Sequence, residues 1–210
     1  MNKYPINFRY IGKDRSHFCS SVWALAFWVC GLFLTACDNG FTFGSNDGIS
    51  ETDSLFLGMY LGMEQQAFFD HCTELNSQKL ITQGPGGSTS VEHRIKDVFD
   101  AEVVMRFFPT FIDHKIFEMP VTYNYAAWAP WNKQYQADVL LEKMLGKYKE
   151  WYGEDFQLLN HETQGKVYYK IDGKRRINLF IKDDQFVQAV FTDLKTEKRL
   201  KEEYKKSLEE

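Results

Sequence analysis

An apolar run without a charged residue, from Val22 to Leu34, divides this 210-residue chain into a leader and a part that must fold in water. One acidic residue, Asp14, and four basic residues precede the run: Lys3, Arg9, Lys13 and Arg15. A basic start, a short apolar stretch and small residues behind it are typical of a secretory signal peptide. An uncleaved anchor stays open as the alternative, because an extension from Phe18 to Cys37 nearly reaches the about 20 residues of a spanning helix.

The run ends in Leu34-Thr35-Ala36-Cys37. This tetrapeptide resembles the bacterial lipobox, in which the cysteine is acylated and becomes the mature N-terminus. The resemblance implies a lipoprotein of the bacterial cell envelope that faces the periplasm and is held to the membrane by acyl chains on Cys37. Asp38 resembles an inner-membrane retention signal of enteric bacteria. That rule depends on lineage, so the choice between inner and outer membrane stays open.

Removal of residues 1–36 leaves one ordinary domain, or two small halves that share a sheet. The leader holds four of the 25 Lys and Arg residues and one of the 29 Asp and Glu residues, so the rest carries 21 basic and 28 acidic residues, a net charge of −7. An acidic surface argues against a nucleic-acid partner. Cys72 is the one cysteine left besides Cys37, and its helical pattern with Phe68 and Leu75 predicts a buried thiol.

Composition predicts five segments along the chain. They are a signal peptide at 1–36, a polar tether at 37–54, a first unit at 55–125, a second unit at 126–194 and a charged C-terminal helix at 195–210. The repeated Leu-Gly-Met of residues 57–63 predicts an extended or turning lead-in, because two glycines weaken a helix there.

Each unit is predicted to hold one helix followed by four strands. The first has a helix at 63–78 and strands at 79–82, 90–96, 102–108 and 115–125; the second has a helix at 135–152 and strands at 156–161, 166–171, 175–182 and 185–192. Asp172-Gly173 predicts a hairpin turn and Gly153 a helix cap. Pro120 predicts an edge or a bulge at its position.

The fold class is therefore α+β, with two helix-plus-four-stranded antiparallel units in tandem and the helices on one sheet face. This element order resembles the tandem fold of the beta-lactamase inhibitor protein. With the helix entry Gly62-Met63-Glu64, it also resembles the SmpA/OmlA outer-membrane assembly lipoproteins, and the chain is similar to lipoproteins common in Bacteroidetes. No catalytic residue carries over from these families.

Residues with catalytic or metal-binding chemistry do not form a recognisable motif. The histidines His71, His93, His114 and His161 make no His-x-x-x-His pair, no Cys-x-x-Cys exists, and Asp113-His114 would point to opposite faces of a strand. Ser88 and Ser90 lie in a glycine-rich turn, and the acidic pairs at 154–155 and 183–184 lie in turns. We therefore expect no metal, no cofactor and no enzyme.

Aromatic residues give the best candidate site. The group is Tyr123, Tyr125, Trp128, Trp131 and Tyr135, at the joint between the units. One interpretation makes them core, and the other makes them a platform for a partner, because Trp and Tyr dominate binding hot spots. The basic Lys174-Arg175-Arg176 is either a solvated hairpin or a contact for an acidic partner.

Three functions remain open. The leading hypothesis is a non-catalytic protein-binding or scaffolding lipoprotein that uses the open sheet face and the Trp128–Trp131 loop. The second is an envelope small-ligand or glycan binder or hydrolase, which predicts a concave pocket. The third is a purely structural envelope protein.

Overall fold

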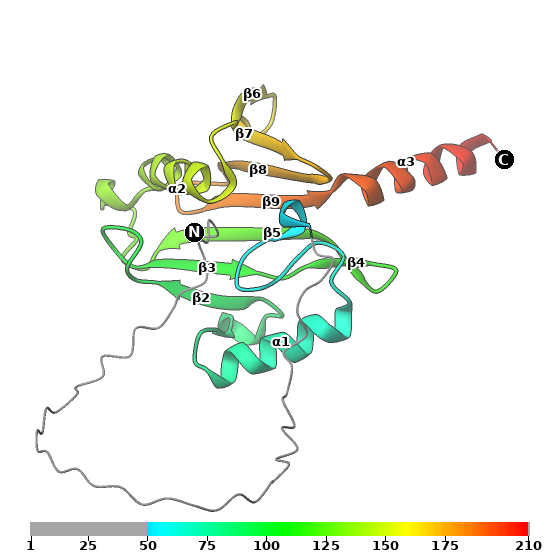
Figure 1. Ribbon diagram of the computed structural model, residues 1–210. Coiled ribbons are helices and arrows are strands. Elements are labelled where there is room, and N and C mark those ends of the chain that lie inside the picture. The colour runs from blue at the N-terminus through cyan, green and yellow to red at the C-terminus, as the bar shows by residue number, and fades with distance from the viewer. Residues whose placement is uncertain (1–49, 210) are drawn as a thin grey trace, which may run out of the picture. The chain divides into compact units, whose positions relative to one another are not determined.

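The computed structural model describes residues 50–209, and the predicted signal peptide, Cys37 and most of the predicted tether lie outside this range. The described residues hold three α-helices and nine strands (Figure 1). The helices are α1 (Gln65–Ser77), α2 (Ala137–Tyr152) and α3 (Leu194–Glu209). The strands are β1 (Thr82–Gln83), β2 (Val91–Ile95), β3 (Val103–Phe107), β4 (Thr110–Ile112), β5 (Lys115–Tyr125), β6 (Gln157–His161), β7 (Gly165–Asp172), β8 (Arg175–Ile181) and β9 (Val187–Asp193).

All nine strands belong to one antiparallel sheet in the order β1-β2-β3-β5-β9-β8-β7-β6, with β4 paired to β5. The predicted α+β class is confirmed. The two strand groups are not separate sheets, because β5 and β9 pair directly, with Val121 opposite Ala189. This pairing makes β5 and β9 the centre of the sheet.

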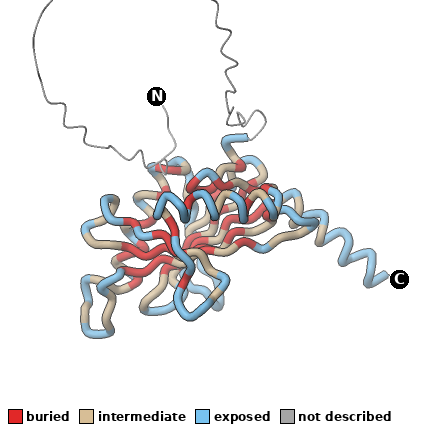
Figure 2. The backbone as a smooth tube through the Cα atoms, turned by 90° about the horizontal axis from the view of Figure 1, so that it is seen from below, coloured by how far each residue is buried: buried red, intermediate tan, exposed pale blue. Residues whose placement is uncertain are grey.

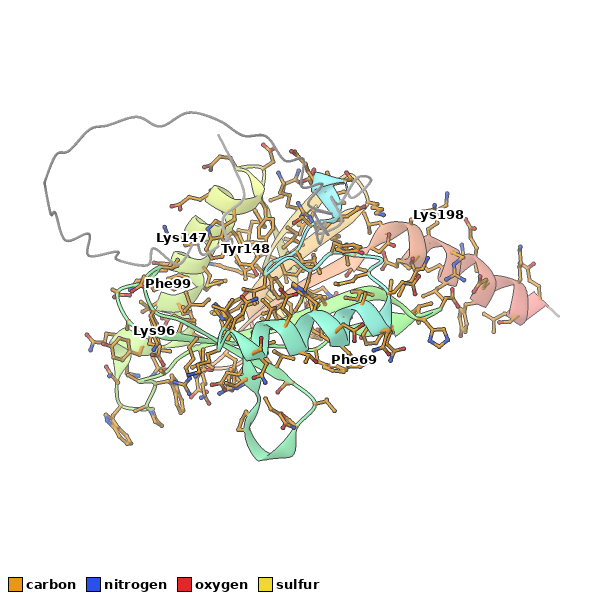
Figure 3. The ribbon with its side chains drawn as sticks, turned by 60° about the horizontal axis from the view of Figure 1, so that its bottom comes forward. Phe69, Lys96, Phe99, Lys147, Tyr148 and Lys198 are labelled. Atoms are coloured by element: carbon orange, nitrogen blue, oxygen red, sulfur yellow. The ribbon has the colours of Figure 1, made fainter. Side chains whose placement is uncertain are left out.

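The core lies on one face of the sheet, which we call the inner face. Along the central strands every second side chain points to this face and is buried, including Val121 and Tyr123 of β5 and Phe191 of β9. Helix α2 packs on this face, and its Tyr148 lies between the helix and the sheet (Figure 3) with its ring 6.0 Å from that of Phe191. Figure 2 shows that the buried residues gather along the strands.

The segment before α1 also covers the inner face. The ring of Phe56 lies 5.0 Å from that of Phe107 and 5.9 Å from that of Phe191. The predicted turning lead-in is confirmed, because the backbone turns at Leu57 (φ 50°) and Gly58 (φ 77°). This segment therefore closes the core between the two strand groups.

Most predicted elements have the correct type, but the first strand was misplaced and strand β4 was missed. The first strand lies at Thr82–Gln83 rather than 79–82, because Lys79 takes a left-handed conformation (φ 60°) that follows α1. Asp113 and His114 do not belong to a strand. Both have positive φ and form the two-residue turn between β4 and β5, a conformation that Asp and His tolerate better than most residues.

Pro120 lies in a central strand and not at the sheet edge, and the pairing pattern explains why it is tolerated. It faces Val190 of β9 on one side. On the other side the partners of β3 end at Val121 and those of β4 begin at Glu118, so Pro120 has no register partner there. The missing N–H of proline is therefore accommodated at a break in the ladder.

Helix α3 touches the sheet only near its start. Glu197 pairs with Arg176 of β8, and Arg199 pairs with Asp113 of the β4–β5 turn. Tyr204 and Leu208 further along are exposed, in keeping with the predicted solvated helix. Within residues 50–209, no helix has the length and apolar character needed to cross a membrane.

Candidate functional site

The second face of the sheet, which we call the open face, carries the alternate side chains of the central strands. These side chains include Glu118 and Thr122 of β5, Gln188, Val190 and Thr192 of β9, and Arg176, Asn178 and Phe180 of β8. The segment before α1 and helix α2 pack on the inner face. Of the described residues, α3 meets the open face through the Glu197–Arg176 pair.

A groove of about 490 Å³ runs along the open face over β8 and β9. Its lining consists of Glu118, Thr163, Gln164, Arg176, Asn178, Phe180, Ile181, Lys182, Gln188, Val190 and Thr192. Phe180 and Val190 supply apolar surface, and the side-chain amides and hydroxyls around them supply donors and acceptors. The β6–β7 turn, with Thr163 and Gln164, closes one end. This composition suits a ligand with both apolar and peptide-like polar groups.

The two ends of the groove differ in charge. Glu118 accepts a hydrogen bond from Thr192 (3.2 Å) and forms no ion pair with any residue of 50–209. Lys182 lies at the other end, 6.0 Å from the ring of Phe186, and within the same range no carboxylate pairs with it. Gln188 and Thr192 of the lining lie four positions apart on β9, which corresponds to about 13 Å of strand. The groove is thus long enough for several residues of an extended chain.

An ion pair fixes the Glu118 end. Arg176 donates two hydrogen bonds to Glu197, at 3.0 and 3.2 Å. Burial alone would raise the pKa of Glu197, but hydrogen bonds from Arg176 and Lys201 outweigh it and lower the pKa below its usual value. The bidentate geometry holds the guanidinium plane in place.

The predicted aromatic group is divided between core and surface. Tyr123 and Tyr125 are buried, because strand alternation directs both to the inner face. The Tyr123 hydroxyl lies 2.9 Å from that of Tyr148, and the ring of Tyr125 lies 5.0 Å from that of the half-buried Tyr135. For Tyr123 and Tyr125 the core interpretation holds, since a partner could not reach them in the folded protein.

Trp131 has the opposite environment. Its side chain is 84% exposed, at the tip of the loop between β5 and α2. The loop is held by the side-chain amide of Gln136, whose Nε2 lies 3.2 to 3.4 Å from the carbonyl oxygens of Ala129, Pro130 and Asn132. Half-buried Trp128 anchors it further. An exposed tryptophan on a fixed loop is thus available to a partner with little ordering cost.

The Trp131 loop contacts the β8–β9 turn, which follows the groove residue Lys182. The Nε1 of Trp128 donates to the carbonyl oxygen of Asp184 in the β8–β9 turn (3.3 Å), and the same oxygen accepts the backbone N–H of Ala137. Lys182, just before that turn, lines the end of the groove. Sequence reasoning found the tryptophans but missed the groove, whose residues come from three strands. The sequence signal that could have indicated the groove was the alternation of polar and apolar residues along β5, β8 and β9.

The basic triplet is neither a solvated hairpin nor a free basic patch. Lys174 pairs with Asp53 (2.9 Å), Arg175 with Asp172 (2.9 Å) and Arg176 with Glu197. These pairs attach the segment before α1 and the start of α3 to strand β8. The solvated-hairpin interpretation is therefore wrong for Arg175, which is buried, and a contact of the triplet with an acidic partner stays a prediction.

His71, His93 and Cys72 serve the fold. His71 and His93 each bond a backbone carbonyl at 2.6 Å, that of Leu57 and that of Leu80. Burial lowers the pKa of His93 and raises the pKa of the Cys72 thiol to about 11. In residues 50–209 no group of three or more His, Cys, Asp and Glu side chains is placed to hold a metal ion.

Comparison with known proteins adds no relative: no protein-family model, no curated protein and no solved structure matches this chain. The function must therefore be argued from the groove, the Trp131 loop and the lipobox resemblance.

Proposed function

We propose that this protein is a lipid-anchored module of the bacterial cell envelope that binds a protein partner without catalysis. The partner would lie along the open-face groove and cover Trp131. The observation that carries the proposal is the 84% exposure of Trp131 on a loop that Gln136 fixes and that Trp128 bonds to the β8–β9 turn, directly after the groove residue Lys182.

The exposed side chain of Trp131 would favour association if a partner covered it. An aromatic side chain of this size buries roughly 150–250 Å² when covered, and at about 25 cal/mol per Å² that favours association by several kcal/mol before ordering costs. Tryptophan is also among the residues most enriched at binding hot spots. Because Gln136 already holds the loop, little of this gain is lost in ordering it.

The groove supports an extended polypeptide as the occupant. A peptide presents amide groups to side chains such as Asn178 and Gln188, and its side chains could pack on Phe180 and Val190. The carboxylate of Glu118 and the ammonium of Lys182, which form no ion pair within residues 50–209, would set the direction of a charged segment. The acyl chains on Cys37 would hold this site at the membrane surface.

Site-directed photo-cross-linking in native membranes tests the proposal. A photoreactive aromatic residue, which keeps an aromatic side chain at position 131, replaces Gln188 in the groove or Trp131 on the loop, and a matched control replaces Glu142, an exposed residue of α2. We expect one protein adduct, identified by mass spectrometry, from positions 188 and 131 but not from 142. A Cys37→Ser form should lose the adduct if the partner is an envelope protein.

Equal adducts from all three positions, or none from 188 and 131, would contradict the proposed site. An adduct that persists fully in the Cys37→Ser form would leave a protein-binding site but contradict the anchored location. These outcomes separate the binding function from the localisation.

The groove also favours a second candidate, an envelope small-ligand or glycan binder or hydrolase. A volume of about 490 Å³ falls in the range of small-molecule sites, and the amides and hydroxyls could bond sugar hydroxyls. Thermal-shift measurements with glycan fragments test it. A stabilisation lost in an Asn178→Leu variant, with no protein adduct in the cross-linking experiment, would favour this candidate over the first.

We propose further that residues 55–125 and 126–194 are tandem copies of one helix-plus-strands unit. The order β1-β2-β3-β5 is mirrored by β6-β7-β8-β9 about the β5–β9 pair, and a helix precedes each group. Co-expressed fragments divided within the Trp131 loop should reassemble through β5 and β9. Fragments that do not associate would contradict this.

A further inference from the structure

Strand β6 forms one edge of the sheet and pairs only with β7 within the described part of the chain. The backbone groups on its other side therefore have no strand to bond. All five residues of β6 are exposed, with Leu158 at 52% and Leu159 at 49%. Leu159, opposite Val167, points to the open face, and Leu158 points to the inner face.

The strands at the two ends of the sheet order, β1 and β6, differ in length and composition. Strand β1 has two residues and is followed by Gly84-Pro85, so it offers little to pair with. Strand β6 is longer, contains no proline and no charged residue, and pairs with β7 in a continuous register without a bulge. Soluble proteins usually protect an edge with a charge, a proline, a bulge or a short strand, and β6 has none of these.

We propose that β6 pairs antiparallel with the β6 strand of a second copy of this chain and joins the two sheets across a two-fold axis. In the register that uses all five residues, Leu159 lies opposite Leu159 of the second copy, and Gln157 lies opposite His161. The leucines on both faces then gain a partner surface, and the free backbone groups bond to each other.

Charge around the edge permits this self-pairing although the chain as a whole is acidic. No charged residue occurs in the five paired positions, so no like charges face each other there. The acidic residues that precede β6 are balanced within the same copy: Glu154 lies 3.9 Å from Lys149, and Asp155 lies 3.5 Å from Lys170. A basic partner is therefore not needed to neutralise the edge.

The pairing of five residues buries less than the about 1,200 Å² of a standard interface, so the dimer is weak in dilute solution. Confinement of two anchored copies to one membrane would raise their effective concentration. The increase in effective concentration rests on the proposed lipid anchor, whereas the pairing of the two β6 strands does not. The experiment is therefore performed on the full chain in its native membranes.

A cysteine scan measures the pairing. Single cysteines replace each residue of 157–161 in turn, the membranes are oxidised briefly, and the species at twice the chain mass is measured without reductant. We expect a maximum at Leu159→Cys, about tenfold above Ile171→Cys, because facing residues lie within disulfide reach and a residue one strand further from the axis does not. Ile171 is a matched control, since it is 57% exposed on the same face but lies in β7.

A scan without a position above the Ile171→Cys control would overturn the proposal. A disulfide-linked product of another mass would overturn it as well, because the edge would then take a different protein. All scanned residues are exposed, so five independent substitutions guard against the misfolding of any single variant.

Discussion

The guanidinium carbon of Arg175 lies 4.9 Å from the centre of the Tyr152 ring. Arg175 is buried, whereas a solvated hairpin would have left it exposed. Arg175 also donates to the backbone oxygen of Ser54 and to the carboxylate of Asp172, while the Tyr152 hydroxyl donates to the carbonyl oxygen of Leu55 (2.8 Å). Arg175 and Tyr152 thus clamp the segment before α1. The clamp joins Ser54 and Leu55 to β8 and α2.

Loss of this clamp is expected to destabilise the fold. Arg175→Ala removes a buried charge partner and the ring contact, and should lower the free energy of unfolding by about 2–4 kcal/mol. Lys198→Ala is the matched control, because Lys198 lies on exposed α3 (Figure 3). This substitution should change the free energy of unfolding by less than about 0.5 kcal/mol. Urea unfolding measures both. Equal effects would show that the Arg175 clamp does not stabilise the fold.

The buried hydroxyl pair of Tyr123 and Tyr148 is expected to act as a unit. Tyr148→Phe leaves the Tyr123 hydroxyl without its partner in the core and should cost about 1–3 kcal/mol. The double replacement by phenylalanine should cost less than either single one, because no unsatisfied group remains. Additive costs in a double-mutant cycle would contradict the coupling.

The buried tyrosines are expected to make the folded protein less stable at alkaline pH. Burial raises the pKa of Tyr123, of Tyr148 and of Tyr152 above the usual value of 10.0. Above pH 10 the unfolded chain loses these protons while the folded protein keeps them, so the free energy of unfolding falls as pH rises. Urea titrations between pH 9 and pH 11 test this, and the Tyr123→Phe/Tyr148→Phe variant should show a shallower fall.

His93 is expected to make the folded protein less stable at acidic pH. Burial lowers its pKa below 6.5, although the bond to the Leu80 carbonyl opposes that shift. Below about pH 6.5 the unfolded chain binds a proton that the folded protein does not, so stability decreases as pH falls toward the folded-state pKa. His93→Gln should weaken this dependence. An unchanged slope between pH 7 and pH 5 would rule out His93 as its source.

Cys72 should be unreactive while the protein is folded. Burial raises the pKa of its thiol to about 11, so little thiolate exists at pH 8. Alkylation measured on the peptide that holds Cys72 should rise sharply with the addition of denaturant. Rapid labelling of the native protein would contradict the packing of the half-buried Cys72 against the core.

The sequence was a good guide to local structure and a poor one to the site. Alternation and the Asp172-Gly173 turn predicted the β7–β8 hairpin, because these signals depend on neighbouring residues. Strand β4 was missed, since its turn uses Asp113 and His114 in place of glycine.

Which aromatic residues are exposed could not be predicted, because that depends on how distant segments pack. Tyr125 and Trp131 are six positions apart, and one is buried by α2 and the other fully presented to solvent. The groove brings together residues of β5, β8 and β9 that share no local motif. The clamp of Arg175 depends on the segment before α1, which lies more than a hundred residues earlier.

The most direct measurement of the central claim is the yield of the partner adduct from a photoreactive residue at position 188 in a Trp131→Ala background. If the groove and the Trp131 loop form one site, the yield should fall about tenfold or more while urea unfolding stays unchanged, because Trp131 is exposed and supports no core. An undiminished yield would mean that Trp131 takes no part in holding the partner and would contradict the account.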